Sequence, residues 1–426
     1  MRTSRSRVLA LGAMLGAAAV IATGCAGGGG SGGGGDDQTL RVAMGSPGEA
    51  QIRVWESVGA EFEKAHEGWT VEFNFMDDDQ YQTIGLPNLL AGRNAPDVYF
   101  EWVGSRLETR YADGFAADLT EAAQGPLGDL FDAEAFGPGS VDGKVVMVPH
   151  IADVTNVLWY NTDIFAEHGL TPPTTWDELL TVCDTLSAAG IPPIASGNKD
   201  LWAAGNWLGH VTSRVVGEDA YDSALKGETS FDTPEWVAAF EKVKELADHK
   251  CVNESINAIN DNEGAQLFFQ GNAAMHAIGS WLVSWAIDEA PDLNFDFVNW
   301  PEMDGAGDQG SVIGVVTGYV VNAKSDEAHQ KAAIDFLTLL NSDANVDQFI
   351  AAEAVPLALS ASDNAEIDER TLRLNGLLSE SGTVINPPDT GYDLGTAEAF
   401  YSALAAVIGG QASPEDAVKT LAGAVG

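Results

Sequence analysis

Basic residues are scarce in this chain of 426 residues. Lysine and arginine number 21 against 63 aspartates and glutamates, which gives a formal net charge of −42. Three of the basic residues lie within residues 1–24, so the rest of the chain is more acidic still. Such a surface repels nucleic acid and anionic lipid, which argues against both as binding partners. The acidity alone says nothing about a small ligand.

Metal-binding and catalytic motifs are also missing. The seven histidines show no ligand spacing that suggests zinc, and there is no nucleophile elbow, Walker A loop or His-Glu-x-x-His. Gly305–Gly310 fits the dinucleotide fingerprint, but a polar segment precedes it and an apolar strand follows, so we interpret it as a loop. The acidic run Asp77–Asp79 lacks the glycine and distal glutamate of a calcium loop. We therefore predict no catalytic residues, no metal and no cofactor.

Long hydrophobic runs are nearly absent. The only one is Val8–Ile21, whose 14 residues fall short of the roughly 20 that span a bilayer. Arginines precede it and Ala22–Cys25 follows it, an arrangement that resembles a lipoprotein signal cleaved before Cys25, with a membrane anchor as the alternative. The glycine-rich residues 26–35 are typical of a flexible tether. We predict a signal peptide over residues 1–24 and a lipidated tether over 25–37.

The remainder alternates between strand and helix patterns. Apolar residues alternate in 40–44 and 71–75, which predicts strands, and Trp55, Val58 and Phe62 repeat at helical spacing between them. Strand, helix, strand indicates an α/β sheet. The other segments that we expect to be regular are strands at 98–100, 144–148, 154–160, 190–194 and 312–321, and helices at 81–90, 234–247 and 328–340.

The stretch 142–186 organises the chain. We expect the first strand in it to stop at Pro149, the polar residues 150–153 to form a crossing point, and a second strand to follow. Thr175 and Glu178 have the spacing of a capping box, which predicts a helix from Trp176.

Several motifs together resemble a known family. Asp142-Gly143-Lys144, Tyr160-Asn161, Thr175–Leu179 and Gly279-Ser280-Trp281 occur in an order and spacing similar to the extracellular solute-binding proteins of bacterial carbohydrate ABC transporters, family 1. The resemblance implies a two-lobed, type II periplasmic-binding-protein-like α/β fold, each lobe a mixed sheet flanked by helices, with three hinge crossings. The lobes it implies are residues 38–151 plus 317–354 and residues 152–316 plus 355–426.

The resemblance also implies a function. We expect a monomeric lipoprotein on the extracellular face of the bacterial cell membrane that binds an oligosaccharide between its lobes. It would deliver this ligand to an ABC permease with a cytoplasmic ATPase, and it would not be an enzyme. Two alternatives stay open, a secreted glycoside-active enzyme and a receptor for a non-sugar solute such as a polyamine or peptide.

The tryptophans supply the first candidates for the ligand site. Indole rings suit the apolar C–H face of a sugar, and open α/β sheets bind ligands at the carboxyl ends of their strands. Of 11 tryptophans, four fall at predicted strand ends or in loops with glycine and asparagine, and Trp281 is the strongest of them because it also matches the family turn. These four are Trp102, Trp202, Trp207 and Trp281.

Polar candidates follow from position along the chain. Carboxylate, amide and hydroxyl groups after strands, at the crossings or in a proline-glycine loop are placed to bind sugar hydroxyls. They are Glu49, Asp79, Glu101, Asp153, Asn156, Ser280, Tyr319 and Tyr392. Cys183 and Cys251, the thiols left after Cys25, fall in one predicted lobe and can pair in an oxidising exterior, with two buried free thiols as the alternative.

Overall fold

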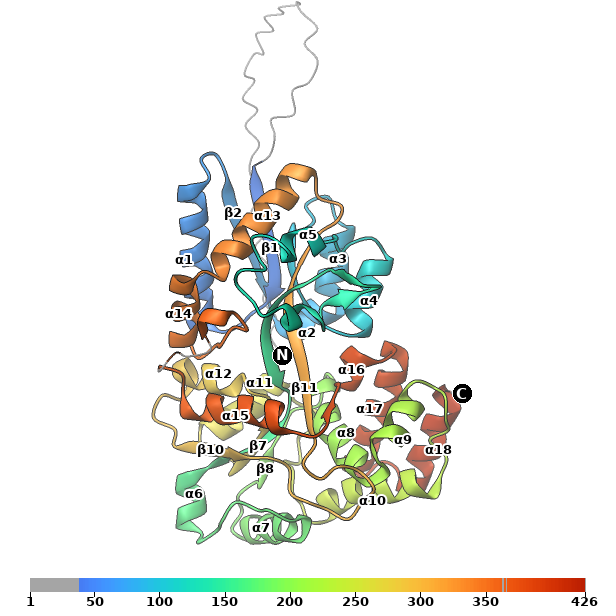
Figure 1. Ribbon diagram of the computed structural model, residues 1–426. Helices are drawn as coiled ribbons and strands as arrows, with labels where there is room; N and C mark the ends of the chain where they lie inside the picture. The colour runs from blue at the N-terminus through green and yellow to red at the C-terminus, as the bar shows by residue number, and fades with distance from the viewer. Residues whose placement is uncertain (1–37, 362–363, 365, 426) are drawn as a thin grey trace, which may run out of the picture. The chain divides into compact units, whose positions relative to one another are not determined.

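The computed structural model describes residues 38–361, 364 and 366–425. The predicted signal peptide, Cys25 and the tether lie outside this range. The described residues form one compact unit built on a six-stranded and a four-stranded sheet, and the short strands β4 (Ser140–Val141) and β5 (Lys144–Val145) pair as a third, two-stranded sheet (Figure 1). Mixed sheets flanked by helices confirm the predicted α/β class.

The first sheet has six strands. β1, β2 and β3 pair in parallel, while β11 runs antiparallel to both β3 and β6. Residues of β1 alternate between two cores, with Val42 in one and Ala43 in the other, because successive side chains point to opposite faces. The order is β12 (Val384–Ile385), β11 (Val312–Val321), β3 (Val98–Trp102), β1 (Thr39–Gly45) and β2 (Thr70–Met76), with β6 (Val148–Val154) also on β11.

Helix α1 (Glu49–Ala65) shows how the sequence builds this layer. Trp55, Val58 and Phe62 recur at three- and four-residue spacing and are completely buried against the sheet, as their periodicity predicts. The other helices of this part of the chain are α2 (Asp78–Gln80), α3 (Leu86–Ala91), α4 (Ser105–Ala112), α5 (Thr120–Ala123), α13 (Glu327–Leu340) and α14 (Asp343–Ala351).

The second sheet has four strands, in the order β10 (Phe295–Val298), β7 (Val157–Asn161), β9 (Met275–Ile278) and β8 (Ile194–Ala195). It too separates two cores, with Leu158 in one and Trp159 in the other. The predicted capping box at Thr175 and Glu178 is confirmed at the start of α7. The helices here are α6 (Thr162–Glu167), α7 (Trp176–Ala188), α8 (Trp202–Val216), α9 (Glu218–Leu225), α10 (Pro234–Asp248), α11 (Asp261–Phe269), α12 (Leu282–Glu289), α15 (Glu369–Glu380), α16 (Pro388–Gly391), α17 (Leu394–Ile408) and α18 (Pro414–Val425).

Two long strands connect the two halves. In β6, Val148 packs in a core of the first sheet and Val154 in a core of the second. In β11, Val312 packs in a core of the second sheet and Tyr319 in a core of the first. Ala361 still belongs to the first sheet's core and Leu374 to the second's, which marks a third passage. The exact residue boundaries of the lobes remain predictions.

The prediction that a strand ends at Pro149 is wrong. β6 runs through it, from Val148 to Val154. Pairing with β11 shifts register between Thr317 and Gly318, so His150 is an extra residue in a bulge. A proline is tolerated at such a bulge because the ladder there needs no hydrogen bond from its nitrogen. The chain breaks instead at residues 155–156, before β7.

The prediction that Trp202 and Trp207 lie at strand ends or in loops is also wrong, because residues 202–216 form helix α8. Its glycines are packing residues rather than helix breakers. An ideal Cβ on Gly205 would lie 2.3 Å from the ring of Tyr401 on α17, so only glycine lets the two helices approach this closely. By contrast, residues 305–310 do form a loop, as predicted.

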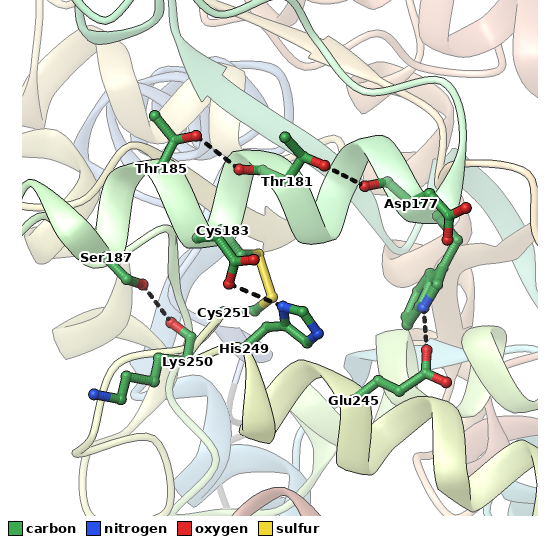
Figure 2. The surroundings of a disulfide bond; sticks show 11 residues. Asp177, Thr181, Cys183, Thr185, Ser187, Glu245, His249, Lys250 and Cys251 are labelled. Atoms are coloured by element: carbon green, nitrogen blue, oxygen red, sulfur yellow. Dashed lines mark hydrogen bonds and ion pairs between the residues drawn. A yellow bond between two sulfur atoms is a disulfide. The ribbon is translucent and has the colours of Figure 1, made fainter.

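A disulfide joins Cys183 on α7 to Cys251, which follows α10 (Figure 2). Both residues are completely buried. Close to it, the Ser187 hydroxyl donates to the carbonyl oxygen of Lys250, and at the other end of α7 the indole of Trp176 donates to Glu245. The disulfide and these two hydrogen bonds therefore connect α7 to α10 and to the residues that follow α10.

Candidate functional site

A cleft of about 470 Å³ lies where the two sheets approach each other. Its lining comes from both halves of the chain: the segments after β1 and β2, the bulged strand β6, the start of α8, helices α11 and α12, and strand β11. The volume lies in the range typical of small-molecule sites.

Seven of the predicted binding residues line this cleft. Trp102 is the last residue of β3, and Glu49, Ser280 and Trp281 follow the ends of β1 and β9 within four residues, close to the carboxyl ends of strands from which they were predicted. They are Glu49, Trp102, Asp153, Trp202, Ser280, Trp281 and Tyr319. An eighth, Asp79, lies in α2, but its side chain is outside the described part of the structure.

Three tryptophans form one aromatic group in the cleft. The ring centroid of Trp281 lies 6.2 Å from that of Trp202 and 6.5 Å from that of Trp285. Gly279 makes this arrangement possible, because an ideal Cβ at that position would lie 2.0 Å from the Trp281 ring. The glycine-serine-tryptophan turn thus lets the indole fold back over the backbone at the end of β9.

Glu101 does not line the cleft, and its prediction as a ligand residue needs correction. It directly precedes Trp102 in β3, and adjacent strand residues point to opposite faces of a sheet. Glu101 is 1 % exposed and its carboxylate accepts a hydrogen bond from Arg110 Nε at 2.9 Å. It is therefore half of a buried ion pair.

Asn156, Trp207 and Tyr392 are also absent from the lining and need the same correction. Asn156 is buried, with its Oδ1 3.0 Å from Nδ1 of His210. Trp207 stacks on Trp300 inside the core because it lies in the middle of α8. The hydroxyl of Tyr392 donates to Asp222, outside the cleft.

Asp153 is a carboxylate in the lining of the cleft. It lies near the end of β6, and its Oδ1 accepts a hydrogen bond of 2.7 Å from the Ser280 hydroxyl. Burial raises the pKa of Asp153 to about 6, against the lowering effect of that hydrogen bond. The pair joins the first crossing strand to the turn that carries Trp281.

Asp78 is a second carboxylate of the lining, which the sequence prediction missed. Gln82 Nε2 donates to it, and Arg106 in turn donates to the Gln82 side chain at 3.1 Å and lies over the ring of Trp102. Burial raises the pKa of Asp78 to about 6 even though the charge of Arg106 lowers it. The rule that selected Asp79, a position just after β2, would have selected Asp78 equally well.

Other lining residues carried no usable sequence signal. Trp285 lies inside helix α12, where a tryptophan is normally a packing residue. Asn206 lies in α8 and Asp389 in the C-terminal part, where the family resemblance weakens. Only the folded chain brings these three segments to one cleft.

The raised pKa of Asp153 predicts a change in stability with pH. A carboxyl whose pKa is higher in the folded state holds its proton more tightly there, so folding stability falls as pH rises from about 4 to about 6. Asp153→Asn should remove this penalty and raise the free energy of unfolding at pH 7.5 by about 2 kcal/mol. Urea unfolding at pH 3.5 should show little difference from wild type, and a variant less stable at pH 7.5 would contradict the prediction.

Within residues 38–361, 364 and 366–425, no helix has the length and apolarity needed to cross a bilayer. The same residues contain no group of three or more histidine, cysteine or acidic side chains arranged to hold a metal ion.

Comparison with known proteins identifies the family. The family model described as bacterial extracellular solute-binding protein matches residues 23–347. An uncharacterized ABC transporter extracellular-binding protein of Pyrococcus horikoshii is 27% identical over 60% of this chain, although the match spans only 59% of that relative's length. A probable sugar-binding periplasmic protein of Brucella suis is 25% identical over 71% of this chain and 75% of its own length.

Solved structures agree on the fold. A chitin oligosaccharide binding protein superposes with a TM-score of 0.82 over 92% of this chain and 98% of its own, at 23% sequence identity. The two-lobed α/β architecture predicted from the sequence is therefore confirmed. With a family model that covers most of its length, the chain belongs to the bacterial extracellular solute-binding proteins.

Proposed function

We propose that the protein captures a saccharide in the cleft between its two sheets and delivers it to an ABC permease driven by a cytoplasmic ATPase. The observation that carries this proposal is the group of Trp202, Trp281 and Trp285 beside Asp153 and Ser280 in one cleft. Ring faces pack against sugar C–H groups, while carboxylates and hydroxyls bind sugar hydroxyls. The sugar-binding name of the Brucella relative supports the same ligand class.

The described contacts between the halves support capture by closure. The backbone N–H of Ala50 in α1 donates to Asp288 in α12 at 3.0 Å. On the α4 side, the Ser105 hydroxyl donates to the carbonyl oxygen of Thr390 at 3.2 Å. Strands β6 and β11 are the connections about which such closure would occur. A ligand that contacts both halves would favour the closed state, since only a difference in affinity shifts the equilibrium.

The remaining parts of the proposal come from the sequence. We infer a lipid on Cys25 that holds the protein at the extracellular face of the bacterial membrane, a monomeric state, and lobes with the boundaries given above. Binding and release need no covalent step, so the protein is proposed to act without catalysis. Its ligand site would include the seven predicted residues in the cleft together with Asp78 and Trp285.

Thermal unfolding and calorimetry with a saccharide panel test this function. A ligand that binds only the folded chain at 100 times its Kd stabilises it by about 2.7 kcal/mol, so one or more mono-, di- or trisaccharides should raise the Tm clearly. Polyamines and short peptides serve as the comparison set. Binding confined to those compounds, or turnover of chromogenic glycosides by the purified protein, would contradict the proposal.

A further inference from the structure

The charged residues that line the cleft are acidic, although Arg53 pairs with Asp288 and Arg106 lies over Trp102 from outside the lining. Nine acidic residues line the cleft, and none of the described residues in its lining is a lysine or arginine. Such a cavity raises the local concentration of cations and disfavours anionic ligands. The nine are Glu49, Asp77, Asp78, Asp153, Asp261, Asp288, Glu289, Glu353 and Asp389.

Glu353 is distinctive among these residues. It follows helix α14 in a left-handed backbone conformation, with φ of +55°. For a residue other than glycine, such a conformation costs on the order of 1–3 kcal/mol and tends to occur at ligand sites. Its Oε2 is buried without a hydrogen-bond partner, and burial raises the pKa of this carboxyl. Oε2 is therefore an acceptor without a hydrogen bond within the described residues, while the charge of Arg370 and the backbone N–H of Asp368 act to lower the pKa of the same carboxyl.

The aromatic group offers a second feature that attracts cations. The face of an indole ring is electron-rich and binds ammonium or guanidinium groups within about 6 Å of its centroid. One ring of the cleft already does so, because the Arg106 guanidinium lies 5.0 Å from the centroid of Trp102. Trp202 and Trp281, whose centroids are 6.2 Å apart, lie in the same cleft as Glu353.

A neutral sugar does not use these features fully. Ionised carboxylates only accept hydrogen bonds, and each sugar hydroxyl supplies a single donor without charge. A protonated amine supplies three donors and a positive charge, which offsets the cost of a buried carboxylate.

We propose that the saccharide bound in this cleft is an amino sugar with a free, protonated amine, and that Glu353 accepts a hydrogen bond from that amine. This inference rests on the proposed saccharide-binding function and narrows its ligand class. It adds a specificity-determining residue from the passage between α14 and α15, where the family resemblance gave no binding residue.

Calorimetry at pH 7 on matched sugar pairs tests the ligand class. The pairs are glucosamine with glucose, galactosamine with galactose, and the β-1,4-linked glucosamine disaccharide with cellobiose. In each pair that binds, we expect the Kd of the amino sugar to be about tenfold lower than the Kd of the neutral sugar, as for a hydrogen bond between charged groups. The advantage should shrink as salt is raised.

Glu353→Gln tests the residue. Glutamine keeps the size of the side chain and removes its charge, so the variant should lose about tenfold in affinity for the amino sugar and keep its affinity for the neutral one. Glu241→Gln, on the exposed side of α10, is the matched control and should change neither affinity. An amino-sugar affinity unchanged by Glu353→Gln would overturn the assignment of this residue.

The outcomes separate the two proposals. If each neutral sugar binds as tightly as its matched amino sugar, the amino-sugar inference is overturned, whereas the proposal of saccharide binding still stands. Spermidine binding without binding of any saccharide would overturn the saccharide function itself.

Discussion

Replacing Trp281 with alanine should weaken saccharide binding at least thirtyfold. Trp281 lines the cleft, follows strand β9, and packs near both Trp202 and Trp285. Tryptophans in such central positions commonly contribute 2 kcal/mol or more to binding, which corresponds to about thirtyfold in Kd. The measurement is calorimetry with the best ligand of the saccharide panel, on wild type and variant in parallel.

Two controls separate lost binding from lost folding. Trp69 directly precedes β2 and so lies at its amino end, whereas the cleft lies at its carboxyl end. The Trp69 ring contacts His329. Trp69→Ala should leave the Kd unchanged. Trp281→Phe should recover part of the affinity, because a smaller aromatic face remains. If the alanine variant, with wild-type circular dichroism, binds as tightly as wild type, Trp281 is not a sugar platform.

The sequence placed Trp281 correctly at the cleft because it follows a predicted strand. A residue after a buried strand lies at the edge of the sheet, and in open α/β folds several such edges meet. Glu49 after β1 and Trp102 at the end of β3 were found in this way. The fold class followed from alternating strand and helix periods together with the family motifs.

The failures have equally specific causes. Trp207 was misplaced because glycines and an asparagine around it suggested a loop, whereas these small residues serve close packing of α8 against α17. Glu101 was misplaced because neighbouring residues of a strand point to opposite faces of the sheet, so Glu101 and Trp102 cannot both face the cleft. Glu353 gave no signal at all, since its backbone conformation and its unpartnered oxygen exist only in the folded chain.

Loss of the Cys183–Cys251 disulfide should have the largest effect on stability. The Cα atoms lie 4.9 Å apart, within the range that an unstrained bridge requires, and 68 positions separate the cysteines in the sequence. Closing a loop of this length restricts the unfolded chain by about 4 kcal/mol in the chain-entropy model. Against the total of roughly 5–15 kcal/mol that is typical of folded domains, this is a large share.

The loop that the bridge closes determines where the effect appears. It contains all of helices α8, α9 and α10, and therefore Trp202 and Asn206 of the cleft. We expect the double variant Cys183→Ala/Cys251→Ala to lose about 4 kcal/mol in urea unfolding. Saccharide affinity measured well below the transition should change little, because the bridge itself does not line the cleft.

Reduction provides the matched control for this prediction. In a Cys25→Ser background, dithiothreitol should destabilise the protein by a similar amount and should not affect the double variant. Without reductant, the unfolded Cys25→Ser protein should contain no titratable thiol. Two free thiols in that titration, or equal stability with and without dithiothreitol, would show that the cysteines are buried but unpaired. Noncovalent contacts, among them the Trp176–Glu245 hydrogen bond, would then be all that holds α7 to α10.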